Sequence, residues 1–195
     1  MADSLFGMTA LVTGGAKRLG RALALALAQE GVHVIIHCNR SRREAERTAA
    51  EARVAGVQAW TVAADLEKPA QVERLFGQAR NLAGKRICFL VNNASVFPAG
   101  RLGGLTAADL TRNIQINAFA PLQLSRQFAR QFRQPAAGLR PCILNLLDCR
   151  VADHDQEHAA YHLSKRLLWD LTHMLALEFA PAVRVNAVAP GLILP

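Results

Sequence analysis

Near its amino terminus the chain reads TALVTGGAKRLG over residues 9–20. An apolar strand-like run, 9–12, leads into a glycine-rich loop, and an alanine- and leucine-rich helical pattern follows at 22–29. Glycine permits a tight turn with close backbone approach, and a helix amino terminus presents amides and partial positive charge to a phosphate. The order of strand, loop and helix therefore predicts a site for the pyrophosphate of a dinucleotide. An ordinary strand-to-helix turn is the alternative, and a P-loop is disfavoured because no GxxxxGK[ST] motif occurs.

Apolar runs alternate with helical patterns along the rest of the chain. Six runs predict strands, at 9–12, 32–37, 59–63, 87–91, 143–147 and 183–188. Helices are expected at 22–29, 42–54 and 72–82, each followed by a glycine, then after a capping box of Thr106 and Asp109, and from Tyr161 toward Phe179. Repeated strand–helix order favours a parallel sheet covered on both faces. We therefore expect an α/β fold, a doubly wound, Rossmann-like parallel sheet in a single domain over residues 1–195, with a surface turn at 134–138.

The composition limits the class of protein. The chain has 195 residues, 51% of them hydrophobic, which suits one domain with a sizeable core. No basic segment precedes an apolar one at the amino terminus, and no apolar run approaches the ~20 residues of a membrane-spanning helix, so we expect a soluble, cytoplasmic protein without a membrane partner. The net charge of +8 comes from basic residues spread along the chain without a nucleic-acid motif, so no nucleic-acid partner is expected.

The end of the second predicted strand bears on the choice of cofactor. Folds that select NAD usually place an Asp or Glu there, which accepts hydrogen bonds from the ribose 2′-hydroxyl. This chain instead reads His37-Cys38-Asn39-Arg40-Ser41, and Arg18 could lean toward the same place. Cationic and hydroxyl donors suit a 2′-phosphate, which predicts NADPH. A solvated basic surface at the start of a helix is the alternative.

Tyr161 and Lys165 are the candidate reactive pair, because a spacing of four places both side chains on one helical face. A free tyrosine, with a pKa of about 10, is a poor proton donor and base at neutral pH. A neighbouring ammonium is expected to stabilise the phenolate and to lower that pKa, so that the pair exchanges protons with a substrate. Taken alone, the same spacing is common between two surface residues.

Together these motifs resemble the short-chain dehydrogenase/reductase family. They match it in order at 13–20, Asn92-Asn93-Ala94, Asn117, Tyr161 with Lys165, and Pro190-Gly191. The resemblance implies that Tyr161 is the general acid/base, that Lys165 also holds the nicotinamide ribose, and that Asn117 supports a proton relay through water. The cofactor site that it implies consists of Gly14, Lys17, Arg18, Leu19, Gly20, His37, Asn39, Arg40, Ser41, Asp65, Leu66, Asn93, Ala94, Tyr161, Lys165, Pro190 and Gly191.

Asp148 departs from the usual pattern of the family, which has a serine at this place before the tyrosine. The chain is most similar to the pteridine reductases, which carry an aspartate here, an arginine in the glycine-rich loop, as at Arg18, and a serine and an aromatic after the asparagines, as at Ser95 and Phe97. The resemblance implies that Phe97 stacks on a pterin ring, that Ser95 and Arg18 contact pterin or cofactor phosphate, and that Asp148 helps Tyr161 to protonate a ring nitrogen.

The expected function is therefore an NADPH-dependent reduction of a small-molecule pterin or folate, in which the cofactor supplies hydride and an acid of the chain supplies the proton. The rival enzyme is a carbonyl (3-oxoacyl) reductase, to which Asp148 is the objection. The rival from another class is a truncated, non-catalytic relative that binds nucleotide.

Two further features complete the expectations. His154, His158 and His162 recur every four residues without an HExxH motif or a thiolate partner, so we expect polar histidines near the mouth of the cleft and no metal site. The chain stops at 192–195, where members of the family normally continue with a substrate-covering segment, a helix and a further strand. We therefore expect a carboxy-terminally incomplete reductase domain whose sixth strand is a sheet edge, and a homo-oligomer where the carboxy terminus is complete.

Overall fold

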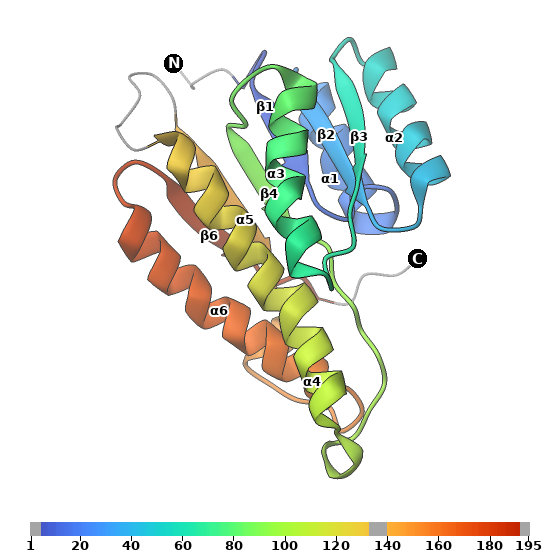
Figure 1. Cartoon of the computed structure of the whole chain (residues 1–195), viewed down its shortest axis with the longest axis vertical. Coiled ribbons are helices and arrows are strands. Elements are labelled where there is room, and N and C mark those ends of the chain that lie inside the picture. Colours follow the sequence, from blue (N-terminus) through green and yellow to red (C-terminus); the bar gives the residue numbers. More distant parts are fainter. Residues whose placement is uncertain (1–4, 133–139, 192–195) are drawn as a thin grey trace.

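A computed structural model describes residues 5–132 and 140–191, so the turn expected at 134–138 lies outside the described residues (Figure 1). Its centre is a six-stranded parallel sheet with the strand order β3-β2-β1-β4-β5-β6. The strands are β1 (Thr9–Val12), β2 (His33–Cys38), β3 (Ala59–Ala63), β4 (Phe89–Asn92), β5 (Cys142–Leu146) and β6 (Arg184–Val188). The α/β, doubly wound, Rossmann-like fold predicted from the sequence is confirmed, and every predicted strand is found within two residues at each end.

The strand order reverses at the centre of the sheet. β1 pairs with β2 on one side and with β4 on the other, and every pair that the structure describes in the sheet is parallel. Chain segments that leave β1 and β4 therefore turn away from each other at the carboxyl ends of these strands. In open α/β sheets a crevice opens at this point, and ligands bind there.

Helices cover both faces of the sheet. They are α1 (Arg18–Gln29), α2 (Arg42–Val54), α3 (Pro69–Ala83), α4 (Ala107–Ile114), α5 (Ala120–Ala129) and α6 (Ala159–Phe179). In Figure 1, α3 and α5 lie in front of the sheet and α1 lies behind it. The buried clusters agree, because side chains of α3, α5 and α6 pack together with one face of the sheet and those of α1 and α2 with the other.

The two cores are built from different residues. Small alanines of α1 and α2, such as Ala24 and Ala49, are fully buried and let these helices approach the sheet closely. On the other face Phe76 and Phe128 pack edge to face with ring centroids 6.3 Å apart. Area burial of this kind supplies most of the stabilisation of a fold of this size.

One continuous helical stretch carries the chain from α4 to α5. Its start is the capping box predicted from the sequence: the Asp109 amide donates to Thr106 Oγ1 at 3.1 Å, and the Asp109 carboxylate accepts from the Thr106 amide. A π-helical turn, Gln115–Phe119, joins α4 to α5 and contains Asn117. Single π-helical turns of this kind occur frequently at functional sites.

One edge of the sheet is formed by β6. In the described residues β6 is the outermost strand on its side of the sheet, as expected for the sixth strand, and most of its residues are exposed.

Across residues 5–132 and 140–191, every helix is too short or too polar to traverse a lipid bilayer.

Candidate active site

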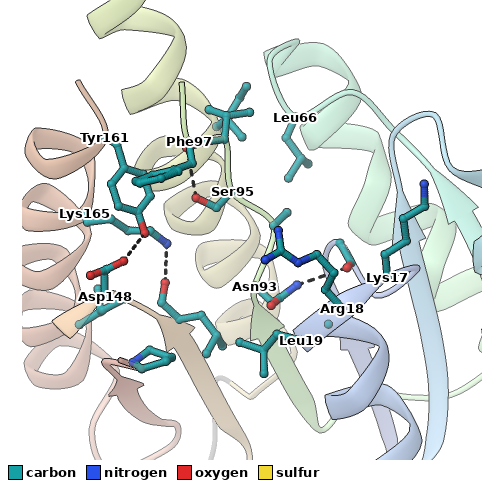
Figure 2. A pocket seen from close by; sticks show the side chains of 18 of the residues that line it. Lys17, Arg18, Leu19, Leu66, Asn93, Ser95, Phe97, Asp148, Tyr161 and Lys165 are labelled. Carbon is teal, nitrogen blue, oxygen red and sulfur yellow. Dashed lines mark hydrogen bonds between the residues drawn. The ribbon is translucent and has the colours of Figure 1, made fainter. Parts of the chain in front are cut away.

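A cleft of about 820 Å³ opens at the carboxyl ends of the strands, where the strand order reverses (Figure 2). It runs from the β1–α1 loop, past the β4–α4 loop, to the amino-terminal half of α6. The predicted site residues that line it are Gly14, Lys17, Arg18, Leu19, Gly20, His37, Asn39, Asp65, Leu66, Asn93, Ala94, Ser95, Phe97, Asp148, Tyr161, Lys165, Pro190 and Gly191. The predicted residues Arg40, Ser41 and Asn117 lie outside its lining.

The β1–α1 loop packs against the end of β4 with no room for side chains. Gly14 has a φ of +63°, and a Cβ atom there would lie 3.0 Å from the Cα of Ala94. A Cβ atom on Gly20 would overlap the Gly14 carbonyl group and the Asn93 side chain. Asn93 Nδ2 donates to the carbonyl oxygens of Thr13 at 2.8 Å and of Gly14 at 3.3 Å. The loop is therefore held with the amino terminus of α1 facing the cleft, which fits the binding of a pyrophosphate.

Two cations flank this loop. Lys17 Nζ lies 2.8 Å from Glu44 Oε1 at the start of α2, so its charge is already paired. Among the described residues, no hydrogen-bonding or ion-pair partner is found for the Arg18 guanidinium, which lies in the cleft in Figure 2. Arg18 also has a φ of +50°, an uncommon conformation for a residue other than glycine. Strained backbone of this kind concentrates at functional sites, and here it accompanies a guanidinium without a protein partner.

His37 lies beneath the loop as a neutral support. The Gly14 amide donates to His37 Nδ1 at 3.2 Å, and His37 Nε2 lies 3.0 Å from the Ala64 carbonyl oxygen, which assigns the proton to Nε2. Burial lowers the pKa of His37 to about 4 although the bond to Ala64 opposes this shift. The expectation of cationic donors at the end of β2 therefore does not extend to His37, because both of its ring nitrogens are occupied by the backbone and its charged form is desolvated.

The remaining residues after β2 surround the outer end of the cleft. Arg40 is exposed, and Ser41 precedes the first residue of α2. Asn39 Nδ2 lies 3.4 Å from Asp65 Oδ1, which also accepts from the Glu67 amide at 3.1 Å. Arg40 is thus free to reach toward a ligand from solvent, and Asn39 and Asp65 form the rim beside it.

The reacting end of the cleft holds Tyr161, Lys165 and Asp148 (Figure 2). The Tyr161 hydroxyl donates to Asp148 Oδ2 at 2.8 Å. Lys165 Nζ donates to the Leu146 carbonyl oxygen at 2.6 Å and lies 5.7 Å from the centroid of the Tyr161 ring. Burial lowers the pKa of Lys165 to about 8, although attraction to Asp148 opposes this. A spacing of four on α6 thus brings both side chains to one wall of the cleft, as predicted.

The predicted direction of the Tyr161 pKa shift is wrong. Burial raises the pKa of Tyr161 above its ordinary value, and the hydrogen bond to Asp148 and the charge of Asp148 raise it further. The sequence argument considered only the ammonium of Lys165, whereas the nearest charge to the hydroxyl is a carboxylate. Arg150 opposes the shift, but only in part. In this structure Tyr161 is therefore a protonated phenol that donates to Asp148.

Asn117 holds the β4–α4 loop against α6 next to the cleft. Its Oδ1 accepts from the Val96 amide at 2.9 Å and from Ser95 Oγ at 3.2 Å. Its Nδ2 donates to the Val96 carbonyl oxygen at 3.0 Å and to Ser164 Oγ at 2.9 Å. Asn117 is buried, so these bonds tie the β4–α4 loop to α6 next to Tyr161. All hydrogen-bonding positions of its side-chain amide are used in this way.

Phe97 forms an aromatic wall together with residues of α6. Its ring stacks on His158 with centroids 3.8 Å apart and planes 12° apart, and it meets Tyr161 edge to face with centroids 4.5 Å apart. Phe97 nevertheless keeps 53% of its surface exposed. A flat substrate beside Tyr161 would therefore meet the part of the Phe97 ring that His158 and Tyr161 leave exposed.

Sequence reasoning missed several cleft residues near Tyr161. His158, Arg150 and Cys149 all line the cleft, and none was assigned a site role. The signal that could have found His158 is its position immediately before the helix of Tyr161, three residues after Asp155, a spacing in which an Asp side chain accepts from the amides that follow it. Among the described residues, no group of three or more His, Cys, Asp or Glu side chains is arranged to hold a metal ion.

Over most of its length the chain is similar to known oxidoreductases. The family model described as short chain dehydrogenase matches residues 8–195. An uncharacterised oxidoreductase of Mycobacterium tuberculosis is 35% identical over 185 residues, which are 95% of this chain and 69% of that protein. The trihydroxynaphthalene reductase of Colletotrichum orbiculare is 28% identical over 189 residues, 96% of this chain and 65% of that protein.

Among solved structures, FolM alternative dihydrofolate reductase 1 from Brucella canis, complexed with NADP, is similar with a TM-score of 0.90 and 37% identity. The match covers 98% of this chain and 76% of that chain. That protein therefore shares the fold described above with this chain.

We predict that Gly20→Ala disrupts the loop, because the added Cβ atom would overlap Gly14 and Asn93. The expected loss in free energy of unfolding is about 1–3 kcal/mol, with at least a tenfold weaker affinity for NADPH, as measured by urea unfolding and by ligand titration. The matched control is Gly77→Ala in α3, where nothing lies within 4 Å of the new Cβ. That variant should gain about 0.5–1 kcal/mol, and equal effects of the two substitutions would contradict the packing argument.

His37 should make the fold sensitive to acid. Its folded-state pKa of about 4 lies below the ordinary value of 6.5, so the unfolded chain takes up the proton first. The contribution of His37 is then fully present above pH 6.5 and is lost as the pH falls toward 4, a difference of roughly 3 kcal/mol in the free energy of unfolding. Urea unfolding across this range, compared between the wild type and His37→Gln, isolates the effect. If the free energy of unfolding depends on pH in the same way in the two proteins, His37 does not contribute to the acid sensitivity.

Tyr161 is the only tyrosine of the chain, so its ionisation can be followed alone through the absorbance of the phenolate. We expect the phenol to remain protonated beyond the ordinary tyrosine pKa of about 10 while circular dichroism shows a folded protein. Asp148→Asn should shift the ionisation to lower pH, because it removes a negative charge and keeps an acceptor. The exposed Asp153→Asn is the control. The argument fails if Asp148→Asn leaves the titration unchanged.

Proposed function

Because the chain belongs to the short-chain dehydrogenase family, we propose that it is an NADPH-dependent reductase of pterins, converting dihydropterins or dihydrofolate to their tetrahydro forms. The observation that carries this proposal is the 2.8 Å hydrogen bond from the Tyr161 hydroxyl to Asp148 at the reacting end of the cleft. A ring nitrogen accepts a proton through its lone pair, and it needs an acid of the chain to supply that proton. Asp148 can share the proton of Tyr161 and so take part in its delivery to the nitrogen.

The NADP-binding residues would be those of the β1–α1 loop and the β2 rim. The Arg18 guanidinium, which has no partner among residues 5–132 and 140–191, and the exposed Arg40 would supply cationic donors for phosphate. The tightly packed Gly14 and Gly20 allow the backbone to approach a pyrophosphate. NADPH, when bound, supplies the hydride of the reduction. The NADP bound by the FolM alternative dihydrofolate reductase supports this choice of cofactor.

Side chains of this protein would supply the proton of the reduction. Tyr161 holds a proton that burial and Asp148 keep on the hydroxyl, so it is a donor and not a base before the reaction. Asp148 lies where it can share that proton and take part in its transfer to a ring nitrogen. The buried Lys165, hydrogen-bonded to Leu146, places a cation behind the ring, which stabilises the phenolate that donation leaves.

The position of Phe97 favours an aromatic substrate. Its ring is half-exposed in the cleft and meets Tyr161 edge to face, so a planar ring laid along it would lie next to the proton donor. The dihydrofolate reductase activity named for the Brucella canis protein agrees with this choice of substrate. The relatives also include a trihydroxynaphthalene reductase, so a substrate other than a pterin is the competing possibility.

The test of the proposed function is NADPH oxidation with dihydrobiopterin, dihydrofolate and an acetoacetyl thioester offered separately. We expect turnover with the pterins, and we expect Tyr161→Phe to lower kcat by about 10²–10⁴-fold because the proton donor is lost. The affinity for NADPH should stay within about twofold, because the variant keeps the ring. Turnover with the thioester alone would replace the proposal by a carbonyl reductase, and NADPH binding without any turnover would leave a nucleotide-binding protein.

The choice of NADPH over NADH has its own test. Arg40→Ala should weaken binding of NADPH by about tenfold or more and leave NADH nearly unchanged, because only NADPH carries the 2′-phosphate. Arg43→Ala, which removes an exposed cation from the first turn of α2, is the matched control for the general loss of positive charge. Equal weakening of both nucleotides by Arg40→Ala would contradict the assignment.

A further inference from the structure

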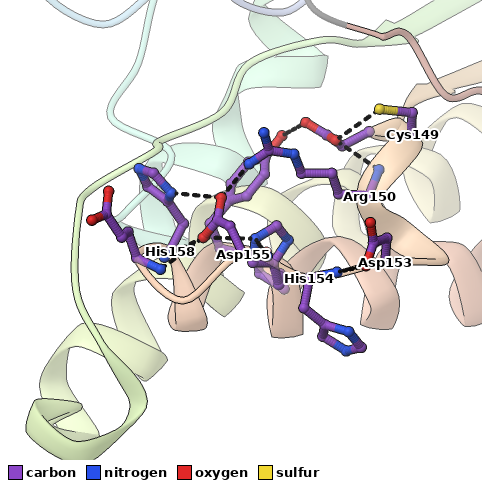
Figure 3. A network of polar contacts seen from close by, with 11 residues as sticks. Cys149, Arg150, Asp153, His154, Asp155 and His158 are labelled. Carbon is purple, nitrogen blue, oxygen red and sulfur yellow. Dashed lines mark hydrogen bonds and ion pairs between the residues drawn. The ribbon is translucent and has the colours of Figure 1, made fainter.

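Asp155 gathers side chains from three parts of the site (Figure 3). Its Oδ1 accepts from the amides of Glu157 at 2.8 Å and of His158 at 2.9 Å. Its Oδ2 lies 2.9 Å from His158 Nδ1 and also accepts from the Arg150 guanidinium. His162 Nε2, on α6 next to Tyr161, lies 3.3 Å from Oδ1. One carboxylate thus links the loop after Asp148 with the start of α6.

These bonds reach the reacting groups through two side chains. His158, oriented by Asp155, is the surface on which Phe97 stacks, and Phe97 in turn meets Tyr161 edge to face. Arg150, held by Asp155, is the cation that lowers the pKa of Tyr161 against the effect of Asp148. The Asp155 carboxylate touches neither Tyr161 nor Phe97 in any described contact, so it acts through its neighbours.

The backbone strengthens the same arrangement. The Gly100 amide donates to the Glu157 carbonyl oxygen, and the Ala159 amide donates to the Gly100 carbonyl oxygen at 3.0 Å. The segment that carries Phe97 is therefore joined to the segment that carries His158 in the manner of a short parallel bridge. With Asn117 holding Ser95 and Val96 at the other end, the position of the Phe97 ring depends on the orientation of His158.

We propose that Asp155 is the positioning residue of the substrate wall: through His158 it fixes the Phe97 ring beside Tyr161, and it holds the Arg150 guanidinium in the lining of the same cleft. In the part of the chain that the structure describes, Asp155 makes no direct contact with a predicted nucleotide-binding residue, so its direct effect falls on the substrate end of the cleft. The consequence for catalysis rests on the proposed function, whereas the consequence for the geometry of Tyr161 and Phe97 does not.

The decisive variant is Asp155→Asn. Its Oδ1 keeps the acceptor for the Glu157 and His158 amides, while Nδ2 replaces the oxygen that binds His158 Nδ1 and Arg150. The loop turn is thus preserved, the ion pair with Arg150 is lost, and the new Nδ2 cannot accept a hydrogen bond from His158 Nδ1. Asp153→Asn is the matched control, because Asp153 lies two residues before Asp155 on the same loop and its side chain accepts only from the amide of the adjacent His154 among the described contacts.

The first measurement is nuclear magnetic resonance of protein labelled with ¹³C-tyrosine, which gives a single set of ring signals because Tyr161 is the only tyrosine. Asp155→Asn should move the ring signals, since the Phe97 ring that meets Tyr161 and the Arg150 guanidinium in the same cleft both change position, and Asp153→Asn should not. Unchanged signals in Asp155→Asn would overturn the proposal. This arm needs no substrate.

The second measurement is steady-state kinetics with dihydrobiopterin and NADPH. Asp155→Asn should raise KM for the pterin by about tenfold, change kcat less, and leave the affinity for NADPH within about twofold. Unchanged pterin KM would overturn the proposal even where the tyrosine signals move. If the wild type turns over only the acetoacetyl thioester, the pterin assignment fails, and the same comparison of KM is made with that thioester. If the wild type turns over no substrate, the tyrosine signals alone decide whether Asp155 positions the wall.

A second variant covers the case in which Asp155→Asn does not fold. His158→Asn keeps a side-chain donor that can face Asp155 but lacks the ring on which Phe97 stacks. It should reproduce the movement of the Tyr161 signals and the rise in KM, and His158→Phe, which restores a ring, should recover part of both. A His158→Asn variant with the wild-type spectrum would overturn the proposal.

Discussion

The close packing of the first turn of α1 on the ends of β1 and β4 is the constraint on which the cleft depends. Gly20 lies against Gly14 and Asn93 with no space for a side chain, and Asn93 holds the carbonyl groups of Thr13 and Gly14. Any widening of this contact would move the helix amino terminus away from the strand ends. The nucleotide end of the cleft is thus set by backbone packing, while the reacting end is set by side-chain hydrogen bonds.

The architecture could be predicted because its signals are local. Parallel strands that are buried on both faces are apolar along most of their length. Each of the helices at 42–54 and 72–82 is followed by a glycine, so the apolar runs and the glycines predicted the same elements. The helical stretch from α4 to α5 was harder to predict beyond its capping box. It changes to a π-helical turn at Gln115–Phe119, which shifts the pattern of buried residues.

The parts of the candidate site that depend only on the type and order of the residues could be predicted from the sequence. Asp148 was identified correctly as the neighbour of Tyr161, yet the direction of the Tyr161 pKa shift was wrong, because that direction depends on burial and on which charge lies nearest in space. His37 was expected among cationic donors, but its depth in the sheet and its two backbone contacts make it neutral. His158 was expected only as a polar histidine near the mouth of the cleft, and the contact of Asp155 with His158 and Arg150 was not predicted, because no periodicity connects these segments.

The bond between His37 and the Gly14 amide couples protons to the nucleotide end of the cleft. His37 accepts this bond only while Nδ1 is unprotonated, so a proton on the ring and the ordered loop exclude each other. Thermodynamic reciprocity then requires that a ligand which favours the ordered loop also makes His37 harder to protonate. A ligand in the cleft therefore makes the fold more stable to acid, and a pH that keeps His37 neutral strengthens binding of the ligand.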